Sequence, residues 1–66
     1  MKHPHSIGLD QMELAVRTRA VLELAGCVSL ADILLIGRQR MAKVRGCGAA
    51  VLNNLEGVAA TFGYRF

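Results

Sequence analysis

A glycine–cysteine–glycine tripeptide, residues 46–48, is the feature that most restricts how this chain can fold. Apolar residues with helical spacing lie on both sides of it, Met41 and Val44 before it and Leu52 and Leu55 after it. Glycine permits positive φ angles and a close approach of two backbones. The tripeptide therefore predicts a tight turn between two helices, which is the pattern of a helix–hairpin–helix motif.

Such a hairpin is a candidate anion-binding site. The first amide N–H groups of the helix that follows it have no acceptor within the helix, and the helix dipole adds partial positive charge at the same end. On DNA, a helix end of this kind binds a backbone phosphate. The alternative is a purely structural turn that packs one helix against the next.

Basic residues gather beside the predicted turn. From residue 37 to residue 48 the chain contains no acid and four cations, namely Arg38, Arg40, Lys43 and Arg45. The formal net charge of the whole chain is +3, which favours a polyanionic partner. The alternative is a solvated helix face, on which a run of charges has no ligand.

Capping patterns and glycines predict where the helices begin and end. Asp10 and Glu13 have the spacing of a capping box, so the first helix is expected within residues 11–25, with Gly26 as its C-terminal stop. Its inward-facing residues are expected to be Met12, Val16, Val21, Leu22 and Ala25.

Three further helices are expected by the same reasoning. Ser29 and Asp32 form a second capping pattern, which opens a short helix that ends at Gly37. Helices over residues 38–44 and 49–61 follow, and Gly63 stops the last one. Their inward-facing residues are expected to be Leu30, Ile33, Leu34, Ile36, Met41, Val44, Leu52, Leu55, Val58, Ala59 and Phe62.

No alternating pattern typical of a strand occurs, and all connections are short. The 66 residues suffice for one domain, and a hydrophobic content of 53% suffices for a compact core. We therefore expect an all-α, compact domain of four to five helices over residues 10–66, preceded by a flexible N-terminal leader over residues 1–9. The aromatic residues near the C-terminus are expected to fold back onto the core: Phe62, Tyr64 and Phe66.

The sequence offers no set of residues suited to catalysis, so an enzyme is not expected. Cys27 and Cys47 lack the spacing of a zinc site and are expected to be small buried hydrophobes. His3 and His5 have no further ligands near them, so neither a metal nor a cofactor is expected. No apolar stretch reaches the roughly 20 residues that span a membrane, and residues 1–9 lack a signal-peptide pattern. These features predict a cytoplasmic protein.

Several segments together resemble a known family. They are residues 14–22 (LAVRTRAVL), residues 25–33 (AGCVSLADI), and the glycine turn with the leucines that follow it, closing on Gly63. Over residues 12–66 the chain is similar to the C-terminal domain of the bacterial RNA polymerase alpha subunit. The resemblance implies a compact helix–hairpin–helix domain that binds upstream promoter DNA through the minor groove and contacts transcription activators.

The resemblance also assigns roles to individual residues. It implies that Arg17 is the arginine that the family inserts into the minor groove, because a narrow A-tract groove attracts such a side chain. It implies that Gly48 is the glycine whose backbone approaches a phosphate. The chain departs from the family at Ala15 in place of a cap, at Ala20 and Val21 in place of Asn–Cys, at Ala50 and Val51 in place of Lys–Ser, and at Asn54 in place of an acid.

Two functions remain open. The first is weak, largely sequence-independent binding to double-stranded DNA in a transcription setting, with no role for a membrane. Its expected site residues are Arg17, Lys43, Arg45, Gly46, Gly48, Ala49, Ala50 and Asn54. The second is a protein–protein interaction module, with RNA polymerase or a transcription factor as partner, that kept the fold and lost the DNA-contact surface. The second function requires one exposed apolar patch formed by Ala20, Val21, Ala50 and Val51.

Overall fold

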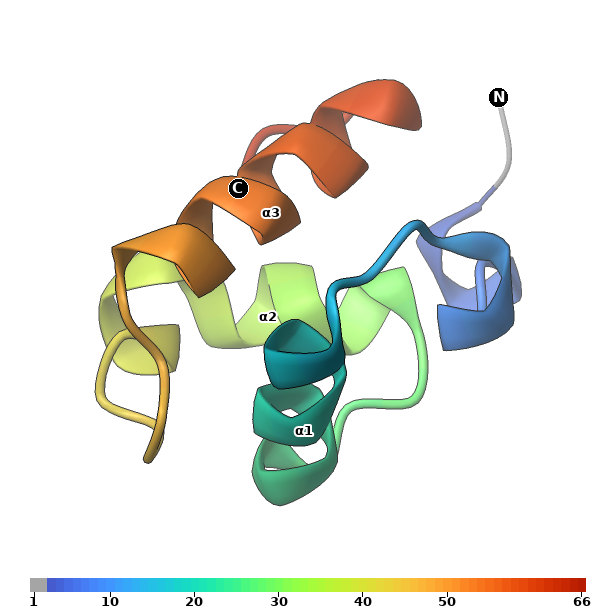
Figure 1. The fold of residues 1–66 in the computed structure, drawn as a ribbon. Coiled ribbons are helices and arrows are strands. Elements are labelled where there is room, and N and C mark those ends of the chain that lie inside the picture. The colour runs from blue at the N-terminus through green and yellow to red at the C-terminus, as the bar shows by residue number, and fades with distance from the viewer. Residues whose placement is uncertain (1–2) are drawn as a thin grey trace.

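The computed structural model describes residues 3–66 as three α-helices preceded by two short 3₁₀-helices, with no strand in this range (Figure 1). The α-helices are α1 (Val16–Ala25), α2 (Leu30–Met41) and α3 (Ala49–Thr61); the 3₁₀-helices are η1 (Pro4–Ser6) and η2 (Leu9–Gln11). The all-α expectation is confirmed, whereas the expected count of four to five helices is wrong. None of the helices within residues 3–66 is both long and apolar enough to cross a membrane.

One hydrophobic core lies where the three α-helices meet. Helix α3 contacts both α1 and α2, and η1 packs against α2 at the end away from the glycine turn (Figure 1). Phe62, Tyr64 and Phe66 are partly buried against this core, as expected for the C-terminal aromatic residues. The buried hydrophobic side chains are Ile7, Met12, Val21, Leu22, Cys27, Leu30, Ile33, Met41, Val51, Leu55, Val58 and Ala59.

Helix α2 spans two of the expected helices. Gly37, the expected stop of the first one, has a non-helical conformation (φ 80°, ψ 166°), so α2 consists of two helical segments that meet there at a kink. Arg40 binds two carbonyl groups of the turn that precedes the kink. Its guanidinium donates to the Leu35 oxygen at 2.8 Å and to the Ile36 oxygen at 3.0 Å. These bonds tie the two halves together across the kink.

Helix α1 begins five residues later than the earliest expected start, at Val16 instead of residue 11. Asp10 lies in η2, and neither η2 nor α1 has a side-chain hydrogen bond from its N-cap residue. The later start changes which side chains face inward. Val16 was expected in the core, but it lies in the first turn of the helix and is 90% exposed. Gly26 ends the helix as expected, in the left-handed conformation (φ 76°).

The segment before residue 10 belongs in part to the packed domain. Ile7 is fully buried in the core, and its carbonyl oxygen accepts a hydrogen bond from the Leu30 amide at 2.9 Å. Gly8 pairs with Ser29 in an isolated antiparallel bridge. The expected boundary at residue 10 is therefore too late, because an apolar side chain inside the leader is needed to fill the core. Residues 1 and 2 of the expected leader lie outside the described part of the chain.

The start of α2 is held by the Asp32 carboxylate, as the capping pattern predicted. One carboxylate oxygen accepts from the Val28 amide at 2.8 Å and from the Ser29 amide at 3.1 Å. The backbone hydrogen bond from Val28 is the main cause that lowers the pKa of Asp32 below its ordinary value of 3.8, with the Ser29 groups and His5 adding to it. The folded state therefore favours the ionised carboxylate.

We predict that Asp32→Ala lowers the free energy of unfolding by about 1 kcal/mol at neutral pH, the usual effect of losing a helix cap. A lowered folded-state pKa contributes stability above the ordinary value of 3.8 and loses it as the pH falls through the lower, folded-state value. The difference between the variant and the wild-type protein should therefore shrink in acid. Denaturant unfolding at several pH values measures it, with the exposed Glu23→Ala as control. A pH-independent difference would contradict this account.

Candidate nucleic-acid interface

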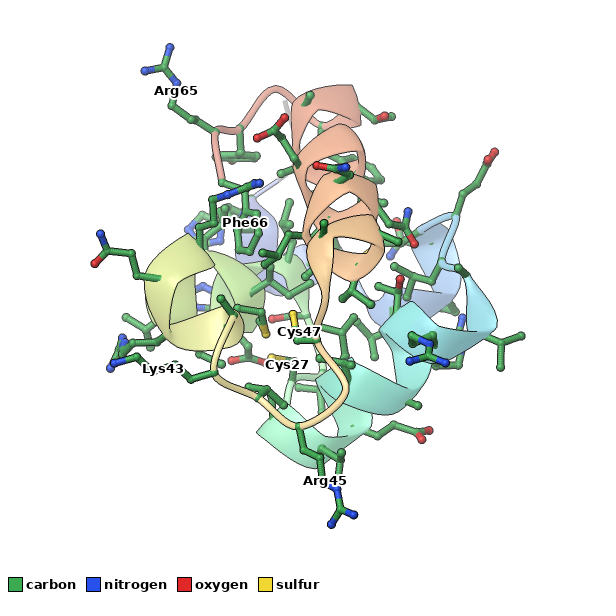
Figure 2. All side chains as sticks on the ribbon, turned by 60° about the vertical axis from the view of Figure 1, so that its left-hand side comes forward. Cys27, Lys43, Arg45, Cys47, Arg65 and Phe66 are labelled. Atoms are coloured by element: carbon green, nitrogen blue, oxygen red, sulfur yellow. The ribbon has the colours of Figure 1, made fainter. Side chains whose placement is uncertain are left out.

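The glycine turn connects α2 to α3 through residues 42–48. Gly46 has a positive φ of 86°, and the Cys47 amide donates to the Val44 oxygen at 3.0 Å, which closes the turn. Gly48 has an extended conformation (φ −106°) and is the N-cap residue of α3. Figure 2 shows Arg45 pointing outward from the turn, while Cys47 lies on the inner side of the fold. The glycine that bends the chain is therefore Gly46 and not Gly48.

The N-terminal end of α3 is exposed and has no side-chain cap. Gly48 has no side chain to bond the first amides, and no acidic residue lies in the first turn. The first helical hydrogen bond of α3 runs from the Leu52 amide to the Gly48 oxygen, at 3.1 Å. The amides of the residues before Leu52 therefore have no acceptor within the helix. Gly48, Ala49 and Ala50 are all solvent-exposed. This end of α3 can therefore receive an anion from solvent.

An open groove brings α1 next to the turn. The groove has a volume of about 590 Å³ and joins three of the expected site residues, Arg17 from α1 and Arg45 and Gly46 from the turn. The turn packs closely on α1 at this point, because a Cβ atom on Gly46 would lie 3.7 Å from a methyl carbon of Val21. The lining residues are Val16, Arg17, Ala20, Val21, Leu24, Arg45 and Gly46.

The four cations between residues 37 and 48 divide into two pairs. Arg38 forms an ion pair with Glu56 at 3.0 Å, and Arg40 binds the carbonyl groups at the kink of α2. Lys43 and Arg45 are exposed and form no ion pair within residues 3–66, and the same holds for Arg17. Only the second pair has neither an ion pair nor a side-chain hydrogen bond to the rest of residues 3–66. Sequence reasoning could not separate the pairs, because Glu56 reaches Arg38 only through the tertiary fold.

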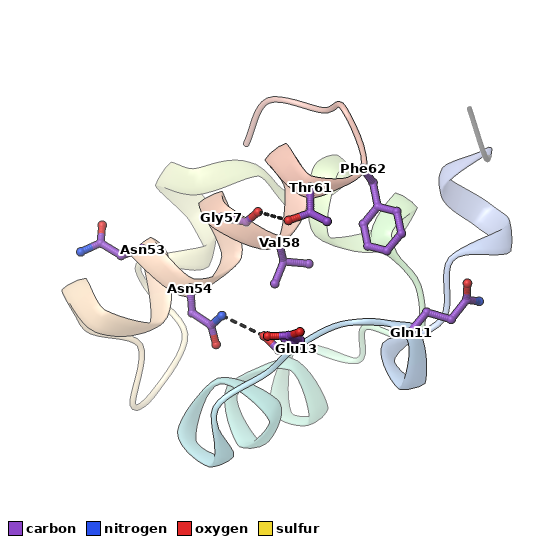
Figure 3. A pocket seen from close by; sticks show the side chains of 8 residues that line it. All are labelled: Gln11, Glu13, Asn53, Asn54, Gly57, Val58, Thr61 and Phe62. Atoms are coloured by element: carbon purple, nitrogen blue, oxygen red, sulfur yellow. Dashed lines mark hydrogen bonds between the residues drawn. The ribbon is translucent and has the colours of Figure 1, made fainter.

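Asn54, which was expected to contact DNA, forms two hydrogen bonds to the backbone. Its Oδ1 atom accepts from the Ala15 amide at 2.9 Å. Its Nδ2 group donates to the Glu13 oxygen at 3.0 Å (Figure 3). The side chain therefore joins α3 to the backbone just before α1, where Ala15 provides no cap of its own. No spacing rule in the sequence links positions 39 residues apart.

The apolar patch expected for the interaction module does not exist. Val21 is 2% exposed and Val51 is 1% exposed, because both side chains belong to the core. Only Ala20 and Ala50 of the four expected residues face solvent. The expectation failed because helical periodicity alone does not show which flank of a helix is covered by its neighbours.

The two cysteines are free thiols. Cys27 is buried, as expected, and burial raises its thiol pKa, with the Asp32 charge adding to the effect. Cys47 is only partly buried, and burial again raises the pKa of the thiol. The His3 and His5 rings stack with their centroids 4.7 Å apart, and no group of three or more potential metal ligands occurs within residues 3–66.

No protein-family model matches this chain, and neither a curated protein nor a solved structure matches it. The candidate interface rests on the geometry described above. It consists of three exposed cations, Arg17, Lys43 and Arg45, together with the exposed start of α3 at residues 48–50. We call this set of residues the basic surface.

We predict that Asn54→Ala lowers the free energy of unfolding by about 1–2 kcal/mol, because it leaves two backbone groups without their partner while water can still reach them. The neighbouring Asn53→Ala is the matched control, since Asn53 is exposed and its side chain forms none of the hydrogen bonds assigned to Asn54. Denaturant midpoints compare the two variants. Equal midpoints would show that the Asn54 bonds do not stabilise the fold.

The two glycines of the turn should respond differently to alanine. Gly46→Ala is expected to cost about 1–2 kcal/mol, because a positive φ is unfavourable for a residue with a Cβ atom. Gly48→Ala should change stability by no more than about 0.5 kcal/mol, because its φ is negative and no atom lies within 4 Å of an added Cβ. Thermal unfolding of both variants tests this, and the reverse order would contradict the turn geometry.

Proposed function

We propose that this chain is a small helix–hairpin–helix module that binds double-stranded DNA weakly and with little sequence preference. The observation that carries the proposal is the basic surface, where three cations on α1 and on the turn before α3, without acidic partners in residues 3–66, accompany an uncapped and exposed helix end. Phosphate groups are the ligands that satisfy both features, because they accept hydrogen bonds from amides and carry negative charge.

The proposed contacts follow from the position of each group. The amides at the start of α3 bind one phosphate, and Gly48 allows the backbone to approach it because no Cβ intervenes. Lys43 and Arg45, on the turn, bind neighbouring phosphates. Arg17 lies across the groove on α1 and reaches toward the minor groove, where a narrow A-tract attracts a guanidinium.

A transcription setting and a cytoplasmic location complete the proposal. Their support is the similarity in sequence to the C-terminal domain of the RNA polymerase alpha subunit, at Arg17 and Gly48 above all. Weak sequence preference is expected because Ala20 and Ala50 are exposed but have no polar group to read a base edge. Most of the affinity then comes from phosphate contacts.

We predict that binding to duplex DNA is strongly salt-dependent, with a log–log slope of roughly −3 to −4 for three or four phosphate contacts. Arg17→Ala and Arg45→Ala should each weaken binding by at least about 1 kcal/mol, the effect of one lost charge-assisted hydrogen bond. Fluorescence anisotropy with a labelled duplex at low salt measures both effects. Arg19→Ala is the matched control, because Arg19 is exposed on α1 but does not line the groove.

Gly48→Ala tests, in the same assay, how much the hairpin contributes to DNA affinity apart from the cations. The added Cβ is expected to reduce DNA affinity by obstructing the phosphate while the protein stays folded. A slope near zero, or no binding at low salt, would remove the proposed function. Full affinity in Gly48→Ala together with losses in the arginine variants would limit the DNA contacts to the cations.

A further inference from the structure

An apolar stripe on α1 is left uncovered. Val16 is 90% exposed and Leu24 is 67% exposed, and Ala20 between them also faces solvent. These residues have i, i+4 and i+8 spacing, so they lie on one face of the helix. Single exposed apolar residues are ordinary on protein surfaces, but these three line one groove with Val21 beside them. Val16, Ala20 and Leu24 therefore form one exposed apolar surface along the groove.

Positive charge borders this apolar surface. Arg17 and Arg45 both line the groove, no acidic residue lines it, and neither arginine forms an ion pair within residues 3–66. A phosphate backbone complements the arginines but has no apolar surface for Val16 and Leu24. A second copy of this chain would offer apolar residues but would place the same two arginines against their counterparts. The complementary partner is both apolar and acidic.

We propose that this groove docks a short amphipathic helix with acidic flanks, contributed by a partner protein. From Val16 to Leu24 the stripe spans about 12 Å at a helical rise of 1.5 Å per residue, which equals about two turns of a docked helix. Apolar residues of the partner would cover Val16, Ala20 and Leu24, as in other helix-in-groove complexes. Carboxylates on its flanks would pair with Arg17 and Arg45. This proposal does not rest on DNA binding, although the two ligands would share both arginines.

The test uses a synthetic helical peptide of alanine and glutamate that carries leucines in one stripe over two turns. Titrated into the isotope-labelled 66-residue chain, it should produce saturable NMR shift changes centred on α1 and on residues 45–46. Leu24→Ser should weaken binding at least about tenfold, the expected effect of losing one buried leucine. Leu24 is exposed in the free protein, so this variant is expected to remain folded.

Two matched controls make the result specific. Leu35→Ser removes another exposed leucine, 78% exposed on α2 and outside the groove, and should bind the peptide like the wild-type protein. A peptide with lysine in place of every glutamate should not bind. Equal binding of both peptides, unchanged affinity in Leu24→Ser, or shift changes centred elsewhere would overturn the proposal, as would concentration-dependent dimerisation that Leu24→Ser abolishes.

The same variants distinguish the proposed DNA binding from peptide docking. Leu24→Ser should retain the DNA affinity of the wild-type protein, because Leu24 has no group that binds a phosphate. Gly48→Ala should retain the peptide affinity, because Gly48 does not line the groove. If the wild-type protein binds the peptide but not DNA, only the proposed function is contradicted. If it binds DNA but not the peptide, only the docking proposal is contradicted.

Discussion

The double hydrogen bond from Asn54 to the backbone before α1 is the interaction on which the candidate interface depends. It fixes the start of α1 against the middle of α3, and the basic surface takes Arg17 from one of these helices and the amides at residues 48–50 from the other. A shift of α1 along α3 would separate the two. The side chain that was expected to contact DNA therefore positions the residues that do so in the proposed complex.

Sequence patterns predicted the local features of the fold well. Helix α3 has the predicted bounds, because glycines flank it and its apolar residues keep one period. The Asp32 cap and the stop at Gly26 were also correct, since each depends on neighbours a few residues away. The predicted start of α1 was wrong, because Asn54 on α3 accepts the hydrogen bond from the Ala15 amide just before this helix. A local pattern contains no information about such a distant contact.

The basic run shows the same limit for the candidate site. Its four cations are equivalent in the sequence, but Arg38 pairs with Glu56 at the surface and Arg40 donates to two carbonyl groups beside the kink at Gly37. The charge left for a ligand depends on where α2 bends and on what α3 places beside it. The groove was also missed, because Val16 was expected to be inside the core. The position of Gly46 in the turn was predicted, whereas the conformations of the two glycines were not.

The exposure of Ala49 and Ala50 has a consequence for how a protein of this kind can diversify. Neither residue is part of the core, and an added Cβ atom on the preceding Gly48 would have no atom within 4 Å. New side chains at these positions would alter recognition at the end of α3 while the core that defines the fold stayed the same. Selection can therefore act on binding and on folding almost independently here, and a single scaffold can acquire new ligands by substitutions at one helix end.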